Sequence, residues 1–382
     1  MIKWKDFRRI NLEKIYINGK QLFSLLVLFE LGTAIVVPLG LSAKQGSWLT
    51  ILLGLVGGVG LFLLYSYLSC LFPGLTLTSY SKKVFGKYVG SLISFAYIVF
   101  FIYGAARDLR DSGEFLQTAM YDVTPIFALN ALMILTIMYV LYKGLEVLAR
   151  TGEIYVVIMF LLLGIGCLLI LFSGNIEMNN LQPLLGKGWK PILTTAYPKM
   201  LMFPFGEAIC FTMILSNLNK PKNGIKTGIV AIVISGITLC LISALEVSVL
   251  GSDIASRSTF PLLTTISKVS IAEFLQRVDI IVVLALITGG FFKTAIFFYA
   301  AVIGATDLFK MKKHQNLVVP IGIIILLSSM SIASNFIQHL ILGDVALKTI
   351  FIVFSFLIPI ILLFAELIRK KLSKDQSTLI PN

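Results

Sequence analysis

Long apolar runs separated by short polar segments dominate the chain from end to end. An α-helix needs about 20 mostly apolar residues to cross the roughly 30 Å hydrocarbon core of a bilayer. A transmembrane β-barrel would instead show short segments of alternating polarity, so the pattern predicts an all-α bundle of membrane-spanning helices. Ten runs qualify or nearly qualify, at about 21–43, 48–72, 88–106, 123–142, 154–176, 197–217, 227–250, 278–307, 315–338 and 346–368.

The composition excludes most other protein classes. Of the 382 residues, 57% are hydrophobic and 13% are charged, and the mean hydropathy is +0.93. Soluble domains carry about 25% charged residues, so a soluble protein, a disordered chain and a small disulfide scaffold are all excluded. Two histidines are too few for a histidine-based metal centre, and we expect no cofactor. The cysteines lie inside apolar runs without a CxxC pair, as buried thiols do: Cys70, Cys167, Cys210 and Cys240.

The distribution of lysine and arginine predicts the orientation in the membrane. The segment before the first run, the tail after the tenth and the even-numbered connections hold 21 of the 32 basic residues, whereas the odd-numbered connections hold eight. Basic residues concentrate on the cytoplasmic side, so both termini are predicted to be cytoplasmic. The net charge of +13 therefore indicates a lipid surface and not a nucleic acid.

We expect one transmembrane domain over residues 1–382. The first apolar run continues through Gly40 without a cleavage site, so it is read as a retained span. Three connections are predicted to be exterior loops that either cap a pathway as short helices or merely join spans: 107–122, 177–196 and 251–277. The parts are a cytoplasmic segment 1–20, five-helix repeats 21–176 and 177–368, and a cytoplasmic tail 369–382.

Two runs, the first and the sixth, contain residues that interrupt α-helices. In the first, Glu30 precedes Gly32 and Thr33, and the sixth contains Pro204-Phe205-Gly206-Glu207. Interrupted helices in matching positions of two halves mark binding sites in transporters, so the two runs are predicted to be equivalent first helices of inverted halves. We expect Gly32–Thr33 and Phe205–Glu207 to face one cavity near mid-membrane, where the positive end of a half-helix suits a carboxylate.

Several short motifs, in this order and spacing, give the chain a resemblance to a known family. They are the two breaks, the segment Asn180–Trp189 before the sixth run, and Arg277-Val278-Asp279 followed by Gly289-Gly290-Phe291-Phe292-Lys293. Over about residues 10–370 the chain resembles the B subunits of bacterial spore germinant receptors. That family is similar to the amino acid–polyamine–organocation transporters, which implies a LeuT-like fold of ten helices in a five-plus-five inverted repeat.

The resemblance implies a location, a role and partners. Members lie in the inner membrane of the dormant spore, sense a small nutrient such as an amino acid, and act with an A subunit and a lipoprotein C subunit. One departure concerns the wall of the pocket near the eighth run. The family pattern leads us to expect a tryptophan seven residues before Lys293, where this chain has Leu286, so the choice of ligand is left open.

Ionisable residues within a span are functional candidates because burying a charge there is costly. Glu207 is predicted to bond to a ligand or gate its access, or alternatively to accept from amides freed by the break. Glu30 is predicted to hold a ligand amine or couple to a cation, or alternatively to pair with Lys199 or Lys293. Lys293 could replace a coupling sodium ion as a fixed or titrating charge, or extend toward an interface, as we expect of Lys199.

Two further sets of residues have a more common structural explanation. Tyr97 and Tyr103 lie on the third run, where a tyrosine hydroxyl can bond to a ligand carboxylate, but buried tyrosines are frequent. Of these, Tyr97 is kept as a candidate ligand contact. The glycines of the second run are predicted to form a small-residue face for close helix packing: Gly54, Gly57, Gly58 and Gly60.

Two functions fit these residues. The first is a sensor in which a transporter-like fold binds a nutrient and activates a complex, thereby triggering germination. The second is an ion-coupled amino acid permease that uses the same pocket. Catalytic motifs such as GxSxG and HExxH are missing from the sequence, so an enzyme is not expected.

Overall fold

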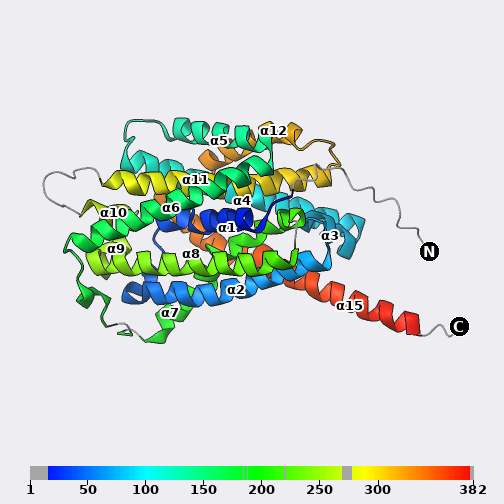
Figure 1. The fold of residues 1–382 in the computed structure, drawn as a ribbon, viewed down its shortest axis with the longest axis horizontal. Coiled ribbons are helices and arrows are strands. Elements are labelled where there is room, and N and C mark those ends of the chain that lie inside the picture. The colour runs from blue at the N-terminus through cyan, green and yellow to red at the C-terminus, as the bar shows by residue number, and fades with distance from the viewer. Residues whose placement is uncertain (1–15, 184, 187, 219–220, 269–277, 379–382) are drawn as a thin grey trace.

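The computed structural model is a bundle of helices that run roughly along one axis (Figure 1). It describes residues 16–183, 185–186, 188–218, 221–268 and 278–378. The helices of more than twelve residues are α1 (Gly19–Leu31), α2 (Ser47–Leu71), α4 (Lys87–Ala119), α5 (Ile126–Lys143), α6 (Leu145–Phe172), α8 (Pro221–Leu250), α11 (Asp279–Leu308), α12 (Gln315–Ser331), α13 (Phe336–Lys348) and α15 (Ile358–Thr378).

Shorter helices fill the breaks and connections. The 3₁₀ helices are η2 (Thr33–Ile35), η3 (Leu41–Gly46), η4 (Met178–Leu181), η6 (Phe205–Met213) and η7 (Leu215–Asn217), and the π-helices are η5 (Ala196–Met200) and η8 (Val353–Leu357). The short α-helices are α3 (Leu77–Phe85), α7 (Trp189–Thr195), α9 (Ser252–Arg257), α10 (Pro261–Ser267) and α14 (Ile350–Ile352).

Within the described residues, seven helical segments are long and apolar enough to cross a membrane. Three of the ten expected spans are not among them. The first and sixth are interrupted, and α12 has 17 residues, so the count of ten stays a prediction. The seven segments are Leu41–Leu71, Lys87–Ala119, Ile126–Lys143, Leu145–Phe172, Gly224–Leu250, Asp279–Leu308 and Phe336–Leu372.

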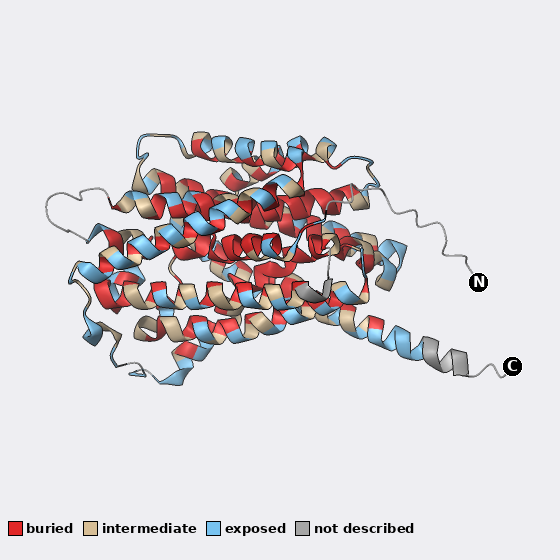
Figure 2. Ribbon diagram, viewed as in Figure 1, coloured by how far each residue is buried: buried red, intermediate tan, exposed pale blue. Residues whose placement is uncertain are grey.

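Two helices form the centre of the bundle. The helix α11 packs against α4, α6 and α1, and α1 lies between α6 and α8. In Figure 2 the ribbon of α1 is almost entirely buried, whereas α6 and the end of α15 carry long exposed stretches. The exposed side chains of α6 are mostly apolar, as a surface that faces lipid requires.

One face of α2 allows span six to approach closely. A Cβ atom on Gly54 would lie 2.7 Å from Met200 Cβ, one on Gly57 2.6 Å from Leu201 Cδ1, and one on Gly58 2.5 Å from Phe205 Cβ. All three contacts are with span six, so the expected packing role is confirmed for these glycines. A Cβ on Gly60 would meet nothing within 4 Å, so this glycine does not belong to the packing face.

The prediction of an exterior loop over residues 107–122 is wrong for most of this segment. Helix α4 continues from the membrane span to Ala119, and Asp108, Arg110 and Asp111 are buried. The charges recur at intervals of three and four residues, which places them along one side of a helix where they find partners inside the bundle. The other two predicted loops contain short helices, namely η4 and α7 in 177–196 and α9 and α10 in 251–268.

The glycines of α2 give a matched test of this packing. Gly58→Ala should lower the free energy of unfolding by about 1–3 kcal/mol, because the new methyl group overlaps Phe205 and neither helix can move freely. Gly60→Ala on the same helix should be neutral or slightly stabilising, since alanine favours helices over glycine. Thermal unfolding of both variants in detergent measures the difference, and equal shifts would contradict the packing assignment.

Candidate functional site

The α-helix of span one ends where glycine permits an unusual backbone. Helix α1 stops at Leu31, and Gly32 has φ +21° and ψ −125° before the 3₁₀ turn Thr33–Ile35. A side chain at Gly32 would be strained because φ lies in the positive region. The break is therefore where the sequence predicts it, and it leaves the backbone of span one irregular inside the bundle.

Span six is interrupted at the predicted proline. After the π-helix that ends at Met200, the chain turns at Phe203 and Pro204 and continues as the 3₁₀ helix η6, whose residues are all buried. Proline has no backbone N–H to donate, so a regular α-helical ladder cannot pass through Pro204. The Gly206 carbonyl accepts a hydrogen bond from the Tyr65 hydroxyl at 3.3 Å.

The backbone of α11 lies directly against the break in span one. A Cβ atom on Gly289 would lie 2.8 Å from the carbonyl oxygen and 2.9 Å from the Cα atom of Gly32. A Cβ atom on Gly32 would in turn lie 2.5 Å from Cδ of Lys293. Two glycines thus bring α11 and α1 into contact, and the aliphatic part of Lys293 passes over Gly32.

Four ionisable side chains, each from a different part of the chain, surround this contact. We call it the central charged cluster and define it as Glu30 on α1, Asp108 on α4, Glu207 on η6 and Lys293 on α11. The Lys293 ammonium is fully buried, with Nζ 2.6 Å from Glu207 Oε2 and 4.0 Å from Asp108 Oδ1. The cluster therefore links span six, α4 and α11 through one lysine.

Residues of both breaks also contact the cluster. The Thr33 hydroxyl donates a hydrogen bond of 3.0 Å to Asp108 Oδ1. The Lys293 ammonium lies 4.1 Å from the ring centroid of Phe203 and 5.5 Å from that of Phe29, which are cation–π distances. The two breaks, far apart in sequence, therefore meet at one lysine.

Glu30 is the least satisfied member of the cluster. Its side chain has no exposed surface, and neither carboxylate oxygen accepts a hydrogen bond from any described residue. It forms no ion pair with Lys199 or Lys293 in the described part of the chain, although the charge of Lys293 acts on it. Burial of an unpaired carboxylate is costly, so a proton or another positive group is needed beside Glu30.

The charges of the cluster are also unequal in number. It contains three carboxyl groups and one ammonium, and one oxygen of Asp108 lacks a hydrogen-bond partner among the described residues. A buried site with this deficit of positive charge and donors can accept a cation or an ammonium group. This is the chemistry that the site offers.

The structure separates some predicted residues from the cluster. Tyr97 lies apart from the cluster, since its hydroxyl donates to the Phe354 carbonyl at 2.8 Å and it is about 16 Å from Asp108 along α4; its role as a ligand contact stays a prediction. Phe205 packs on Gly58 of α2, and Lys199 pairs with Asp344. Asp108 was missed because its segment was taken for a loop, although its spacing from Asp111 could have indicated a helix.

A second polar layer lies next to the cluster toward the Ala119 end of α4. Asp111 Oδ1 lies 2.9 Å from His339 Nε2, and the Arg107 guanidinium donates to the His339 carbonyl at 3.3 Å. The His339 ring stacks on Phe336 at 5.7 Å between centroids, and Phe336 continues to Phe260 at 5.4 Å. These contacts hold α13 against α4, and the layer lies beside the cluster.

Comparisons with known proteins agree with this arrangement. A family profile described as "Spore germination protein" matches residues 16–337. The chain is 41% identical to Spore germination protein KB of Bacillus subtilis (strain 168) over 361 residues, which is 94% of this chain and 97% of that protein. It is 30% identical to Spore germination protein YndE of the same organism over 333 residues, with 85% and 88% covered.

A solved structure resembles the whole bundle. The crystal structure of MhsT in complex with L-phenylalanine superimposes with a TM-score of 0.63 at 13% sequence identity, and it covers 92% of this chain and 99% of that chain. At this identity the likeness concerns the fold alone. It supports the LeuT-like fold that the sequence predicts.

The ion pair between Lys293 and Glu207 can be tested by stability. Lys293→Met should lower the free energy of unfolding by about 3–5 kcal/mol, because it leaves a buried carboxylate without its partner. Lys199→Met should cost about 0–1 kcal/mol, since Lys199 and Asp344 are partly exposed. Adding Glu207→Gln to Lys293→Met should recover much of the loss. Thermal unfolding in detergent measures these variants together with Glu207→Gln alone, and a double variant that loses the sum of the Lys293→Met and Glu207→Gln losses would contradict the pairing.

Proposed function

Because the chain belongs to the spore germination protein family, we propose that it is the transporter-like membrane subunit of a spore germinant receptor. In this proposal it binds a small nutrient, an amino acid, and the bound state triggers germination. The observation that carries the proposal is the meeting of both helix breaks at a buried cluster in which Glu30 has no hydrogen-bond partner among the residues that the structure describes. The fold likeness to a structure with bound L-phenylalanine supports an amino acid as the ligand.

The nutrient is proposed to lie between the two breaks. Its carboxylate would lie at the start of η6, near Phe205 and Gly206, where the positive end of a helix favours an anion. Its ammonium would approach Glu30 and relieve the charge deficit of the cluster. Gly32 and Thr33 would form the opposite wall, because they lie against α11 and Asp108.

Glu207 and Lys293 are proposed to form the switch of the receptor. Lys293 supplies a fixed positive charge beside the break in span one, in the place of a coupling ion. Glu207 is the partner of Lys293 and belongs to η6, so movement of η6 around a ligand changes their 2.6 Å contact. A ligand shifts a conformational equilibrium only by binding one state more tightly, and this contact differs between an empty and an occupied site.

The surroundings of the receptor follow from the family. We propose ten spans arranged as two inverted sets of five, with both termini in the cytoplasm and the protein in the inner membrane of the spore. The partners would be a receptor A subunit and a lipoprotein C subunit. The layer of Asp111 and His339 would be the outer closure, which a nutrient must pass to reach the cluster.

Glu30→Gln tests the site with little change in shape. We expect spores with this variant to lose at least ten-fold in nutrient sensitivity, because the amide cannot neutralise the ligand ammonium. Glu246→Gln is the control, since Glu246 is a buried carboxyl group on α8 that lies outside the central charged cluster. Release of dipicolinate after addition of each of the twenty L-amino acids measures sensitivity, with abundance checked by immunoblot. A normal response of Glu30→Gln at normal abundance would place the nutrient elsewhere.

The same variants separate a sensor from a permease. Reconstituted in vesicles, a sensor should bind the active amino acid without accumulating it under a proton or sodium gradient. Gradient-driven uptake that Glu30→Gln abolishes would instead establish an ion-coupled amino acid permease that uses this site. Uptake is measured with the radiolabelled amino acid that triggers dipicolinate release.

A further inference from the structure

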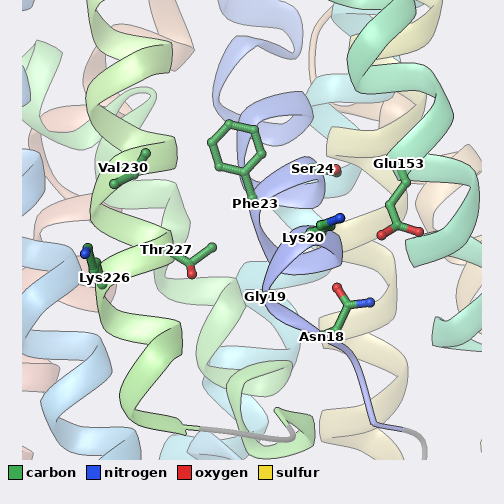
Figure 3. A pocket seen from close by; sticks show the side chains of 9 residues that line it. All are labelled: Asn18, Gly19, Lys20, Phe23, Ser24, Glu153, Lys226, Thr227 and Val230. Atoms are coloured by element: carbon green, nitrogen blue, oxygen red, sulfur yellow. The ribbon is translucent and has the colours of Figure 1, made fainter.

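An open groove lies on the side of the bundle, away from the central charged cluster. It has a volume of about 930 Å³, and its floor is the first two turns of α1. Its walls come from α6 and α8, which stand on either side of α1 (Figure 3). The lining residues are Asn18, Gly19, Lys20, Phe23, Ser24, Glu153, Lys226, Thr227 and Val230.

Most polar side chains of the groove have no partner within the described part of the chain. Ser24 is only 3% exposed, yet its hydroxyl makes no hydrogen bond there, and it lines the groove. Lys20, Lys226 and Glu153 form no ion pair with described residues. Two ammonium groups and one carboxylate give the groove a net positive charge, so an anion is the ligand of complementary charge.

The two lysines are placed to serve two separate anionic groups. Lys20 comes from α1 and Lys226 from α8, and their side chains lie on opposite sides of Thr227 in Figure 3. Asn18 and Gln21 already cap the start of α1 by reciprocal hydrogen bonds of 2.9 and 3.0 Å. Because this cap uses only the backbone N–H and Oδ1 of Asn18, the donors left for a ligand are the two lysines, Ser24, Thr227 and the side-chain Nδ2 of Asn18.

The groove continues into surface that faces lipid. Phe23 and Val230 form its apolar part, and Val230 is followed on α8 by the exposed Ile237 and Leu241. The opposite wall, α6, exposes a similar apolar stripe that includes Ile154 and Leu161. The groove also lies at the end of the bundle where α1 starts and α15 ends (Figure 1), which is the end that basic residues predict to be cytoplasmic.

We propose that this groove binds a bilayer lipid with two phosphodiester groups, a diphosphatidylglycerol. One phosphate binds Lys20 and the other binds Lys226, while Ser24 and Thr227 donate hydrogen bonds to the head group. The acyl chains lie on Phe23, Val230 and the exposed stripes of α6 and α8. Basic pockets between spans at the cytoplasmic side are suited to such head groups.

A lipid in this place would hold α1 in its position. Helix α1 has 13 residues, and Glu30 and Gly32 lie at its other end. The start of the helix contacts the lipid, and its end forms the wall of the central charged cluster. The lipid thus couples the bilayer to the break in span one without touching the nutrient site.

Binding to purified full-length protein in detergent tests the proposal. Native mass spectrometry would be used to titrate tetraoleoyl diphosphatidylglycerol, dioleoyl phosphatidylglycerol and dioleoyl phosphatidylcholine separately. We expect one diphosphatidylglycerol to bind, with weaker binding of the single-phosphate lipid and none of the choline lipid. Lys20→Gln/Lys226→Gln should weaken binding about 25-fold, because each lysine near an anionic lipid contributes about five-fold.

Matched variants make the outcome decisive. Lys143→Gln/Lys313→Gln removes two exposed lysines at the same end of the bundle and should change binding less than two-fold. Val230→Trp keeps both groove lysines but fills the groove, and it should also prevent binding. Any of four results would overturn the proposal. The two double variants could weaken lipid binding equally, or phosphatidylglycerol could bind as tightly as diphosphatidylglycerol. Val230→Trp could bind the lipid as the unmodified protein does, or inorganic phosphate could displace the lipid.

Discussion

The contact between the Lys293 ammonium and the Glu207 carboxylate is the interaction on which the centre of this molecule depends. Both groups are buried, where an unpaired charge is very costly. Both belong to the second proposed repeat, Glu207 on span six and Lys293 on span eight, so the pair fixes α11 against η6. Lys293 can reach Glu207 only because Gly32 has no side chain, since a Cβ there would overlap the lysine.

The same centre contains most of the irregular backbone of the bundle, and its carbonyl groups are largely satisfied from within. Irregular backbone inside a membrane is tolerated where protein or a cavity surrounds it. Tyr65 donates to the carbonyls of Ser355 at 2.5 Å and of Gly206 at 3.3 Å, and Tyr97 donates to that of Phe354. The tyrosines thus serve the π-helix η8 and the break in span six. Glu30 is the exception, because its carboxyl group lies at the break without a donor from the described part of the chain.

The sequence predicted the interrupted helices well because glycine and proline act locally. Gly32 and Pro204 determine where a helix can continue, whatever their neighbours are. The packing face of α2 followed from glycine spacing for the same reason. Asp108 could not be found in this way, since the role of a carboxylate depends on which helix lies opposite it. Its segment also carried more charges than a membrane span usually holds, and only the fold shows that α4 continues with Asp111 paired to His339.

Tyr97 shows a second limit of the sequence, which gives the residue type but not the direction of the hydroxyl. A tyrosine on the third span can bind a ligand only if its hydroxyl is free and points to the cavity. Here the hydroxyl has a backbone partner in the tenth span, which no spacing within the third span could reveal. Pairing across the bundle is set by tertiary packing, so it cannot be read from one helix at a time.

The most direct test of the account is the structure of the protein bound to the amino acid that triggers dipicolinate release. The account predicts the amino acid between Gly32–Thr33 and Phe205–Glu207, with its ammonium within hydrogen-bond distance of a Glu30 oxygen. It also predicts that the Lys293–Glu207 distance differs from the 2.6 Å described above. An amino acid bound elsewhere, with Glu30 still without a partner and the ion pair unchanged, would contradict it.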